Sequence, residues 1–151
     1  CLRDNMRHNR LWLRIDDETS SIQFFDKLGN MKIAITDSSD DQSSLAFFGH
    51  NLKKRLVIVA SGNDVRQMMI YDDDENPRAK LELITGGGFL TMANKDMNKV
   101  SIGAAKASAA LVFIDRTNKP QFAIGVDKSG SGSVRFYDNT GSIIKAVTSQ
   151  D

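Results

Sequence analysis

The stretch Val134-Arg135-Phe136-Tyr137-Asp138-Asn139-Thr140-Gly141 contains the pattern that decides the fold. Apolar residues stand four and two places before Asp138, a variable residue separates them, and a turn follows. The pattern recurs about every 22 residues, and such self-similarity is typical of repeat proteins. Its turn position, here called the anchor, is filled in seven units by Asp4, Asp26, Gly49, Asp72, Asn94, Asp115 and Asp138.

Two apolar columns run through the repeats ahead of the anchors. Alternation with a period of two is typical of a β-strand, and it places both columns on one face of that strand. We expect this face to point toward a core. The column four places before the anchor contains Ile22, Leu45, Met68, Leu90, Leu111 and Val134, and the column two places before it contains Phe24, Phe47, Ile70, Met92, Phe113 and Phe136.

The residues after each anchor predict a hairpin turn and a second strand. An anchor Asp can accept hydrogen bonds from amides two residues on, and Gly or Asn at the fourth turn position tolerates a positive φ. Alternating apolar residues such as Ile33 and Ile35 then resume. The stretch from Ala104 to Ala110 is too short for an independent helix, and its small residues would let two backbones approach closely.

The predicted fold is therefore all-β: seven tandem two-strand repeats of about 22 residues that form an antiparallel meander. A β-solenoid, in which each repeat stacks in parallel on the last, is the alternative. Residues 1–151 are expected to form a single β-repeat domain whose first repeat is truncated at its N-terminus. Cys1 is interpreted as a point of truncation or processing within a longer chain, rather than as the lipidated first residue of a lipoprotein.

Composition excludes several classes of function. Lys and Arg number 20 and Asp and Glu 19, so the chain lacks the positive field expected of a nucleic-acid-binding protein. No apolar run approaches the roughly 18 residues needed to span a bilayer. One cysteine rules out an internal disulfide framework. We therefore expect no nucleic acid partner and no membrane span.

The motif around the anchors resembles a known class of repeat. Met69-Ile70-Tyr71-Asp72 and Arg135-Phe136-Tyr137-Asp138-Asn139-Thr140-Gly141 are its clearest copies. They resemble the YD-type hairpin repeats of bacterial surface and toxin-shell proteins, and also uncharacterised bacterial proteins built from tandem copies of Leu-x-Leu-x-Asp-x-x-Gly-x-x-Arg. The resemblance implies an extracytoplasmic structural role, and hence an extracellular or cell-surface location.

A third column stands directly before the anchors and should face away from the core. Large apolar residues in an outward row are typical of a contact surface. The candidates for what covers it are a second sheet of the same chain, another subunit, or sugar rings stacked on the aromatic side chains. This aromatic column, the predicted self-association or ligand surface, consists of Phe25, Phe48, Tyr71, Ile114 and Tyr137.

Charged clusters give two weaker hypotheses. A basic stripe of Arg10, Lys32, Arg55 and Arg78 lies six places after the anchors and could hold a polyanion, although pairing with nearby turn aspartates is the favoured interpretation. The acidic run Asp72-Asp73-Asp74-Glu75-Asn76 offers oxygen ligands for calcium, but it lacks the spacing of an EF-hand. We expect an ordinary solvated turn there and no metal or cofactor.

The sequence contains none of the short motifs typical of enzymes with a nucleophilic residue, a bound nucleotide or a zinc ion. The sequence therefore favours a non-enzymatic structural repeat protein. We expect it to self-associate into an oligomer or filament at a cell or virion surface, through open strand edges or the aromatic column. The alternative is a glycan-binding module that uses the same column.

Overall fold

The computed structural model describes residues 1–39, 41–62, 66–106 and 108–149. These residues form β-strands joined by turns, with one short 3-10 helix, η1 (His50–Leu52). Nothing helical in the described ranges has the length and apolarity to cross a bilayer. The chain divides into two compact units, Cys1–Pro77 and Arg78–Asp151, which are described separately below. The single domain expected over residues 1–151 stays a prediction.

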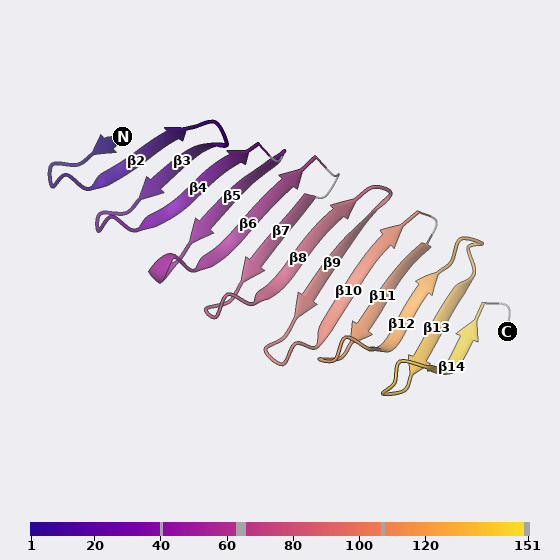
Figure 1. Ribbon diagram of the computed structural model, residues 1–151. Helices are drawn as coiled ribbons and strands as arrows, with labels where there is room; N and C mark the ends of the chain where they lie inside the picture. The colour runs from indigo at the N-terminus through magenta and orange to yellow at the C-terminus, as the bar shows by residue number, and fades with distance from the viewer. Residues whose placement is uncertain (40, 63–65, 107, 150–151) are drawn as a thin grey trace. The chain divides into compact units, whose positions relative to one another are not determined.

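The N-terminal unit is an antiparallel meander. Among its described residues, the paired strands are consecutive in sequence, as the alternating arrows from indigo to magenta show in Figure 1. Its strands are β1 (Leu2–Arg3), β2 (Asn9–Ile15), β3 (Thr19–Phe25), β4 (Met31–Ser38), β5 (Gln42–Phe48), β6 (Lys54–Ser61) and β7 (Arg66–Tyr71).

The C-terminal unit repeats the same organisation. Consecutive strands again pair antiparallel, from β8 with β9 through to β13 with β14. Its strands are β8 (Pro77–Ile84, of which Pro77 belongs to the first unit), β9 (Gly87–Ala93), β10 (Lys99–Ala105), β11 (Ser108–Ile114), β12 (Pro120–Val126), β13 (Gly132–Tyr137) and β14 (Ile143–Thr148).

These pairings confirm the predicted all-β meander of hairpins. The solenoid alternative is wrong, because stacked coils would pair in parallel, whereas the described ladders are antiparallel. Within the stretch from Ala104 to Ala110, Ala104 and Ala105 end β10 and residues 108–110 begin β11, while residue 107 lies outside the described residues.

Six of the seven anchor turns share one pair of backbone hydrogen bonds, and the Gly49 turn differs because it contains η1. At Asp26 the backbone amide donates to the carbonyl of Asn30 (2.8 Å), and the amide of Gly29 donates back to the carbonyl of Asp26 (3.0 Å). The fourth turn position has a positive φ in all seven anchor turns, as the pattern predicted for a hairpin closed by a bulge. The seven residues are Arg7, Gly29, Leu52, Glu75, Met97, Asn118 and Gly141.

Anchor aspartates hold these turns through their side chains. Oδ1 of Asp26 accepts hydrogen bonds from the amides of Leu28 and Asn30, both at 2.9 Å, and Oδ1 of Asp138 does the same for Thr140 and Ser142. The paired amides would otherwise point into the turn without a protein partner. These turns are therefore organised around a side-chain oxygen at their centre, and in the Asn94 turn an uncharged amide oxygen takes this place by accepting from the amide of Asn98 (3.0 Å).

One expectation is wrong: the two apolar columns do not face a core within their own unit. Among the described residues, Ala34, Ala46 and Val57 are the only buried hydrophobic side chains, and no side chain is fully buried. Each unit is one layer of sheet, and a single layer has no second layer against which to bury an apolar face.

The turn geometry predicts a stability change in acid. Partial desolvation raises the pKa of Asp26, but hydrogen bonds from Asn30, Leu28 and Lys32 outweigh it and lower the pKa from 3.8 to about 2. A carboxylate with a depressed folded-state pKa stabilises the fold fully above its unfolded value, and this contribution is lost as the pH falls from 3.8 to about 2. Asn at position 26 keeps an acceptor oxygen but does not titrate. The Asp26→Asn variant should therefore lose less stability than wild type as the pH falls from 3.8 to about 2.

The measurement is the urea midpoint of unfolding as a function of pH, followed by circular dichroism. Asp17→Asn controls for the loss of one exposed negative charge. Identical acid profiles for wild type and Asp26→Asn would contradict the role given to the Asp26 carboxylate.

Candidate interaction surfaces

The strand register aligns the apolar residues of the N-terminal unit into two continuous rows on one face of its sheet. We call the row nearer the anchors the turn-side row and the next one the middle row. The turn-side row is Leu11, Phe24, Ile33, Phe47, Leu56 and Ile70, and the middle row is Leu13, Ile22, Ile35, Leu45, Ile58 and Met68.

The C-terminal unit carries the same two rows. Its turn-side row contains a stack of phenyl rings: the centroids of Phe113 and Phe122 are 5.7 Å apart, and those of Phe122 and Phe136 are 5.2 Å apart. The turn-side row is Ala79, Met92, Val100, Phe113, Phe122 and Phe136, and the middle row is Leu81, Leu90, Ile102, Leu111, Ile124, Val134 and Val147.

These rows are more exposed than apolar rows of a covered sheet would be. Phe24 is 40% exposed, Ile58 40% and Met92 50%. Neighbouring side chains in a row cover each other's sides, so the part that stays exposed is the outer surface of the row. Contiguous apolar surface of this kind is typical of an interaction site rather than of a solvated face.

The opposite face of each sheet carries most of its polar side chains, although in the N-terminal unit Ala34, Ala46, Val57 and Met69 also lie side by side on it. In the C-terminal unit Lys80 and Glu82 form an ion pair (2.9 Å), and the hydroxyls of Thr91 and Ser101 lie 3.2 Å apart. In the N-terminal unit the equivalent positions include Gln23, Thr36 and Ser44. Each sheet thus has one almost wholly apolar face and one mixed face, here called the polar face because most polar side chains of the strands lie on it.

The predicted aromatic column lies on the polar side of the strands, because each member directly follows a residue of the turn-side row. Its five residues Phe25, Phe48, Tyr71, Ile114 and Tyr137 are all half-buried. The hydroxyl of Tyr71 lies 3.3 Å from the Sδ of Met69. The ladder shifts register at Phe24/Phe25 and Phe47/Phe48, so this column sits at the hairpin bulges. Its role in self-association or glycan binding stays a prediction.

The two units differ in a third row, which we call the far row. In the N-terminal unit this row is polar at its centre, where the hydroxyl of Ser43 donates to Asp37 (2.6 Å). In the C-terminal unit it is small and apolar instead. That far row is Leu83, Gly88, Ala104, Ala109, Val126 and Gly132.

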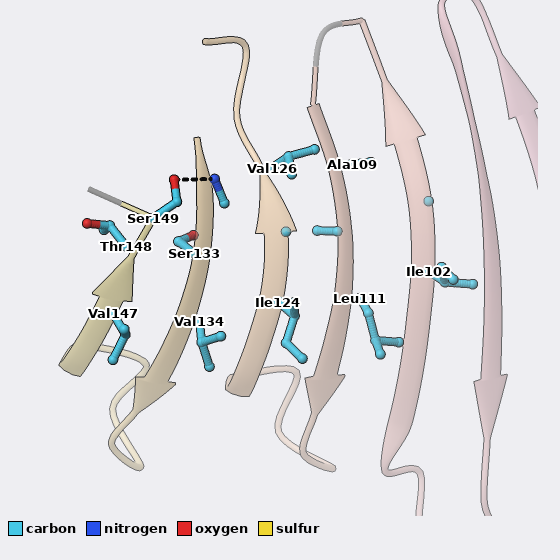
Figure 2. A pocket seen from close by; sticks show the side chains of 14 residues that line it. Ile102, Ala109, Leu111, Ile124, Val126, Ser133, Val134, Val147, Thr148 and Ser149 are labelled. Carbon is cyan, nitrogen blue, oxygen red and sulfur yellow. Dashed lines mark hydrogen bonds between the residues drawn. The ribbon is translucent and has the colours of Figure 1, made fainter. Parts of the chain in front are cut away.

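Small residues in the far row leave a hollow over the C-terminal unit. Its volume is about 620 Å³, and Ile102, Leu111, Ile124, Val134 and Val147 of the middle row form one wall (Figure 2). Ala109 and Val126 stand at the other side, with the hydroxyl of Ser149 accepting a hydrogen bond from the amide of Gly132 (3.2 Å). The lining is almost entirely apolar.

A second hollow of about 510 Å³ lies at the turn end of the C-terminal unit. Its polar groups include Asp115, whose Oδ2 accepts a hydrogen bond from the side-chain amide of Gln121 (2.9 Å). Hydrogen bonds from Lys119 and Thr117 lower the pKa of the Asp115 carboxyl. The carboxylate is thus engaged in its own turn, which is a structural rather than a catalytic arrangement.

All four residues of the basic stripe contact anchor turns. Arg10 pairs with Asp4 (2.6 Å) and Lys32 with Asp26 (3.4 Å), each within its own hairpin. Arg55 pairs with Asp73, and Arg78 donates to the carbonyl of Asn94, both in the turn of the next hairpin along the chain. Each residue of the stripe is thus engaged by a turn of the protein, and its role toward a polyanion stays a prediction.

The acidic run after Asp72 is occupied in a similar way. Oδ1 of Asp72 accepts hydrogen bonds from the amides of Asp74 and Asn76, both at 2.9 Å. Glu75 accepts one from the amide of Lys54 (3.0 Å). Within the described part of the chain, no group of three or more His, Cys, Asp or Glu residues is arranged to hold a metal ion.

Sequence reasoning did not identify the apolar rows as a surface, because strand columns of this kind normally face a core. A signal was present: the positions between the two columns are a mixed set that forms no second continuous apolar column, namely Gln23, Ala46, Met69, Thr91, Val112 and Arg135. No protein-family model matches the chain, and no curated protein is similar enough to match it.

The occupied basic stripe predicts weak, non-specific binding to polyanions. We compare two variants, each with four basic residues replaced by Gln. One changes the stripe residues Arg10, Lys32, Arg55 and Arg78, and the other changes four exposed lysines outside the stripe. Both variants should elute from a heparin column at the same salt concentration. The matched control set is Lys27, Lys95, Lys106 and Lys128, each replaced by Gln. Markedly earlier elution of the stripe variant alone would indicate a polyanion site and contradict the structural role.

Proposed function

We propose that this protein is a non-enzymatic structural repeat protein that self-associates, with the apolar rows as the contact surface. The observation that supports this most directly is the pair of uncovered rows on a single-layer sheet. A sheet with one apolar face needs a second layer for stability, and the described residues of each unit supply none to themselves. A second copy of the chain would supply it.

The area of the apolar face fits this proposal. Seven strands about 4.8 Å apart and about 20 Å long cover roughly 650 Å² of sheet. Two such faces in contact would bury roughly 1,300 Å² in total, within the range of about 1,200–2,000 Å² found for specific interfaces. One unit is therefore large enough to support a stable dimer.

The repeat also favours a copy of the same chain over an unrelated partner. Both apolar rows recur with every hairpin, so two identical faces have ridges and grooves of identical spacing. Sheets of equal twist can pack aligned at about −30° with their side chains interdigitated. Leu, Ile, Val, Met and Phe fill almost all positions of both rows, and Lys145 at the end of the C-terminal turn-side row is the charged exception among the described strands.

The resemblance to YD-type surface repeats supports placing such an assembly at a cell or virion surface, outside the cytoplasm. Repetition of one hairpin unit along a chain is also a common way to build an extended structural element, since each repeat contacts its neighbours. An oligomer or filament is accordingly the assembly that we propose.

Neighbouring phenylalanines test which face carries the association. Phe24 and Phe47 belong to the turn-side row, whereas Phe25 and Phe48 follow them on the opposite face. Phe24→Ser with Phe47→Ser should weaken association by about tenfold or more, because two apolar contacts of the interface are lost. Phe25→Ser with Phe48→Ser should change it by less than about threefold. Sedimentation equilibrium measures both.

Circular dichroism of each variant establishes that the β-structure survives. If only the variant with Phe25→Ser and Phe48→Ser loses association, the contact surface is the aromatic column and not the apolar rows. A wild-type chain that stays monomeric at every concentration would contradict self-association itself.

A further inference from the structure

We propose that the hollow of the C-terminal unit receives the phenyl stack of a second copy, so that two C-terminal units form a reciprocal pair. This inference rests on the proposed self-association and specifies its geometry. The elements concerned are the ridge of Phe113, Phe122 and Phe136 and the hollow over Ala109, Val126 and Gly132.

Ridge and hollow occupy opposite ends of the same strands. Phe113 and Ala109 both lie in β11, Phe122 and Val126 in β12, and Phe136 and Gly132 in β13. In each strand the two residues are four positions apart and therefore on the same face, with one middle-row residue between them. Figure 2 shows that middle row, with Leu111, Ile124 and Val134 side by side.

This arrangement makes the face complementary to itself. A two-fold axis that runs along the middle row, perpendicular to the strands, turns each strand end for end. It places the turn-side row of one copy over the far row of the other, and the reverse contact follows by symmetry. The phenyl ridge of each copy then enters the hollow of its partner, and the middle rows meet at the axis.

The alternative two-fold axis, parallel to the strands, fits less well. It would set phenyl ridge against phenyl ridge and hollow against hollow. The two large rows would hold the sheets apart, and a hollow of about 620 Å³ on each copy would stay unfilled. Protein interfaces and interiors are close-packed, and an unfilled space loses the attractive contacts of its lining.

The N-terminal unit lacks the features that this packing needs. Its far row contains Asp37, hydrogen-bonded to Ser43, and Arg66, so a ridge placed over it would cover charged groups. Burial of a charge without full pairing is unfavourable. The geometry therefore assigns the ridge-in-hollow contact to the C-terminal unit, where the far row is uncharged, and the turn-side and middle rows of the N-terminal unit associate without such an interlock.

Variants that exchange the large residue and the small residue at the two ends of β11 test the proposal. Phe113→Ala removes part of the ridge, and Ala109→Phe fills part of the hollow, so each should weaken the dimer by about tenfold or more. The double variant Phe113→Ala with Ala109→Phe exchanges the two ends of the strand and preserves reciprocity. It should restore the dissociation constant to within about threefold of wild type.

The full chain is used throughout, with the dissociation constant measured by sedimentation and the β-content by circular dichroism. The matched control is Ala146→Phe, on the polar face of β14, which should leave association unchanged. If the β11 variants fail to fold, the same exchange in β12, Phe122→Ala with Val126→Phe, takes their place.

The outcomes separate this inference from the proposed function. Weakened single variants and a restored double variant support the reciprocal pair. A wild-type dimer that tolerates both single changes, or a double variant weaker than either, overturns the reciprocal pair while self-association stands. A wild-type chain that is monomeric at all concentrations overturns both.

Discussion

The constraint on which this structure depends is that a β-sheet with one apolar face must have that face covered. Each unit satisfies its backbone hydrogen bonds within one antiparallel meander, yet its buried hydrophobic residues are limited to Ala34, Ala46 and Val57 among those described. Hydrogen bonding thus determines the sheet, but it leaves two rows of large apolar side chains half-exposed. The proposed self-association follows from these uncovered apolar rows.

The hairpin turns repeat the same uncovered apolar residues along each unit. An anchor carboxylate accepts two backbone amides, the fourth turn position adopts a positive φ, and the ladder shifts at a bulge just before the anchor. The anchor turns differ in detail, yet each described hairpin keeps its apolar residues in register, and a slip by one residue would move them to the other face. The recurring hairpin therefore produces two continuous apolar rows within each unit.

The sequence predicted the hairpins well because their signals are local. Period-two alternation around Phe24 and Ile22 and the turn residues from Asp26 to Gly29 are each interpretable within one repeat. Positive φ was not predicted residue by residue at the four turns that lack Gly or Asn in the fourth position, because these side chains do not favour it and the repeat geometry overrides their preference. The four residues are Arg7, Leu52, Glu75 and Met97.

The interaction surface could not be predicted from the same signals, because exposure depends on how many layers the fold has. An apolar column such as Phe47 and Ile70 has one sequence pattern whether a second sheet of the chain or another molecule covers it. The hollow over Ala109 and Gly132 depends on three strands lying side by side with small residues in register, which is visible only once the strands are paired. Sequence did indicate that small residues near Ala104 to Ala110 would allow close approach.

Methionine oxidation tests the central claim, that another copy covers the apolar rows in solution, most directly. Met6 is 78% exposed and lies outside the rows, while Met92, in the turn-side row, is 50% exposed and Met68, in the middle row, is 37% exposed in the chain alone. Peroxide oxidises accessible methionine sulfur, and mass spectrometry of peptides gives the rate at each site. The account predicts that Met92 and Met68 are protected relative to Met6 at high protein concentration and lose that protection on dilution. Rates that follow the exposure of the isolated chain at every concentration would contradict it.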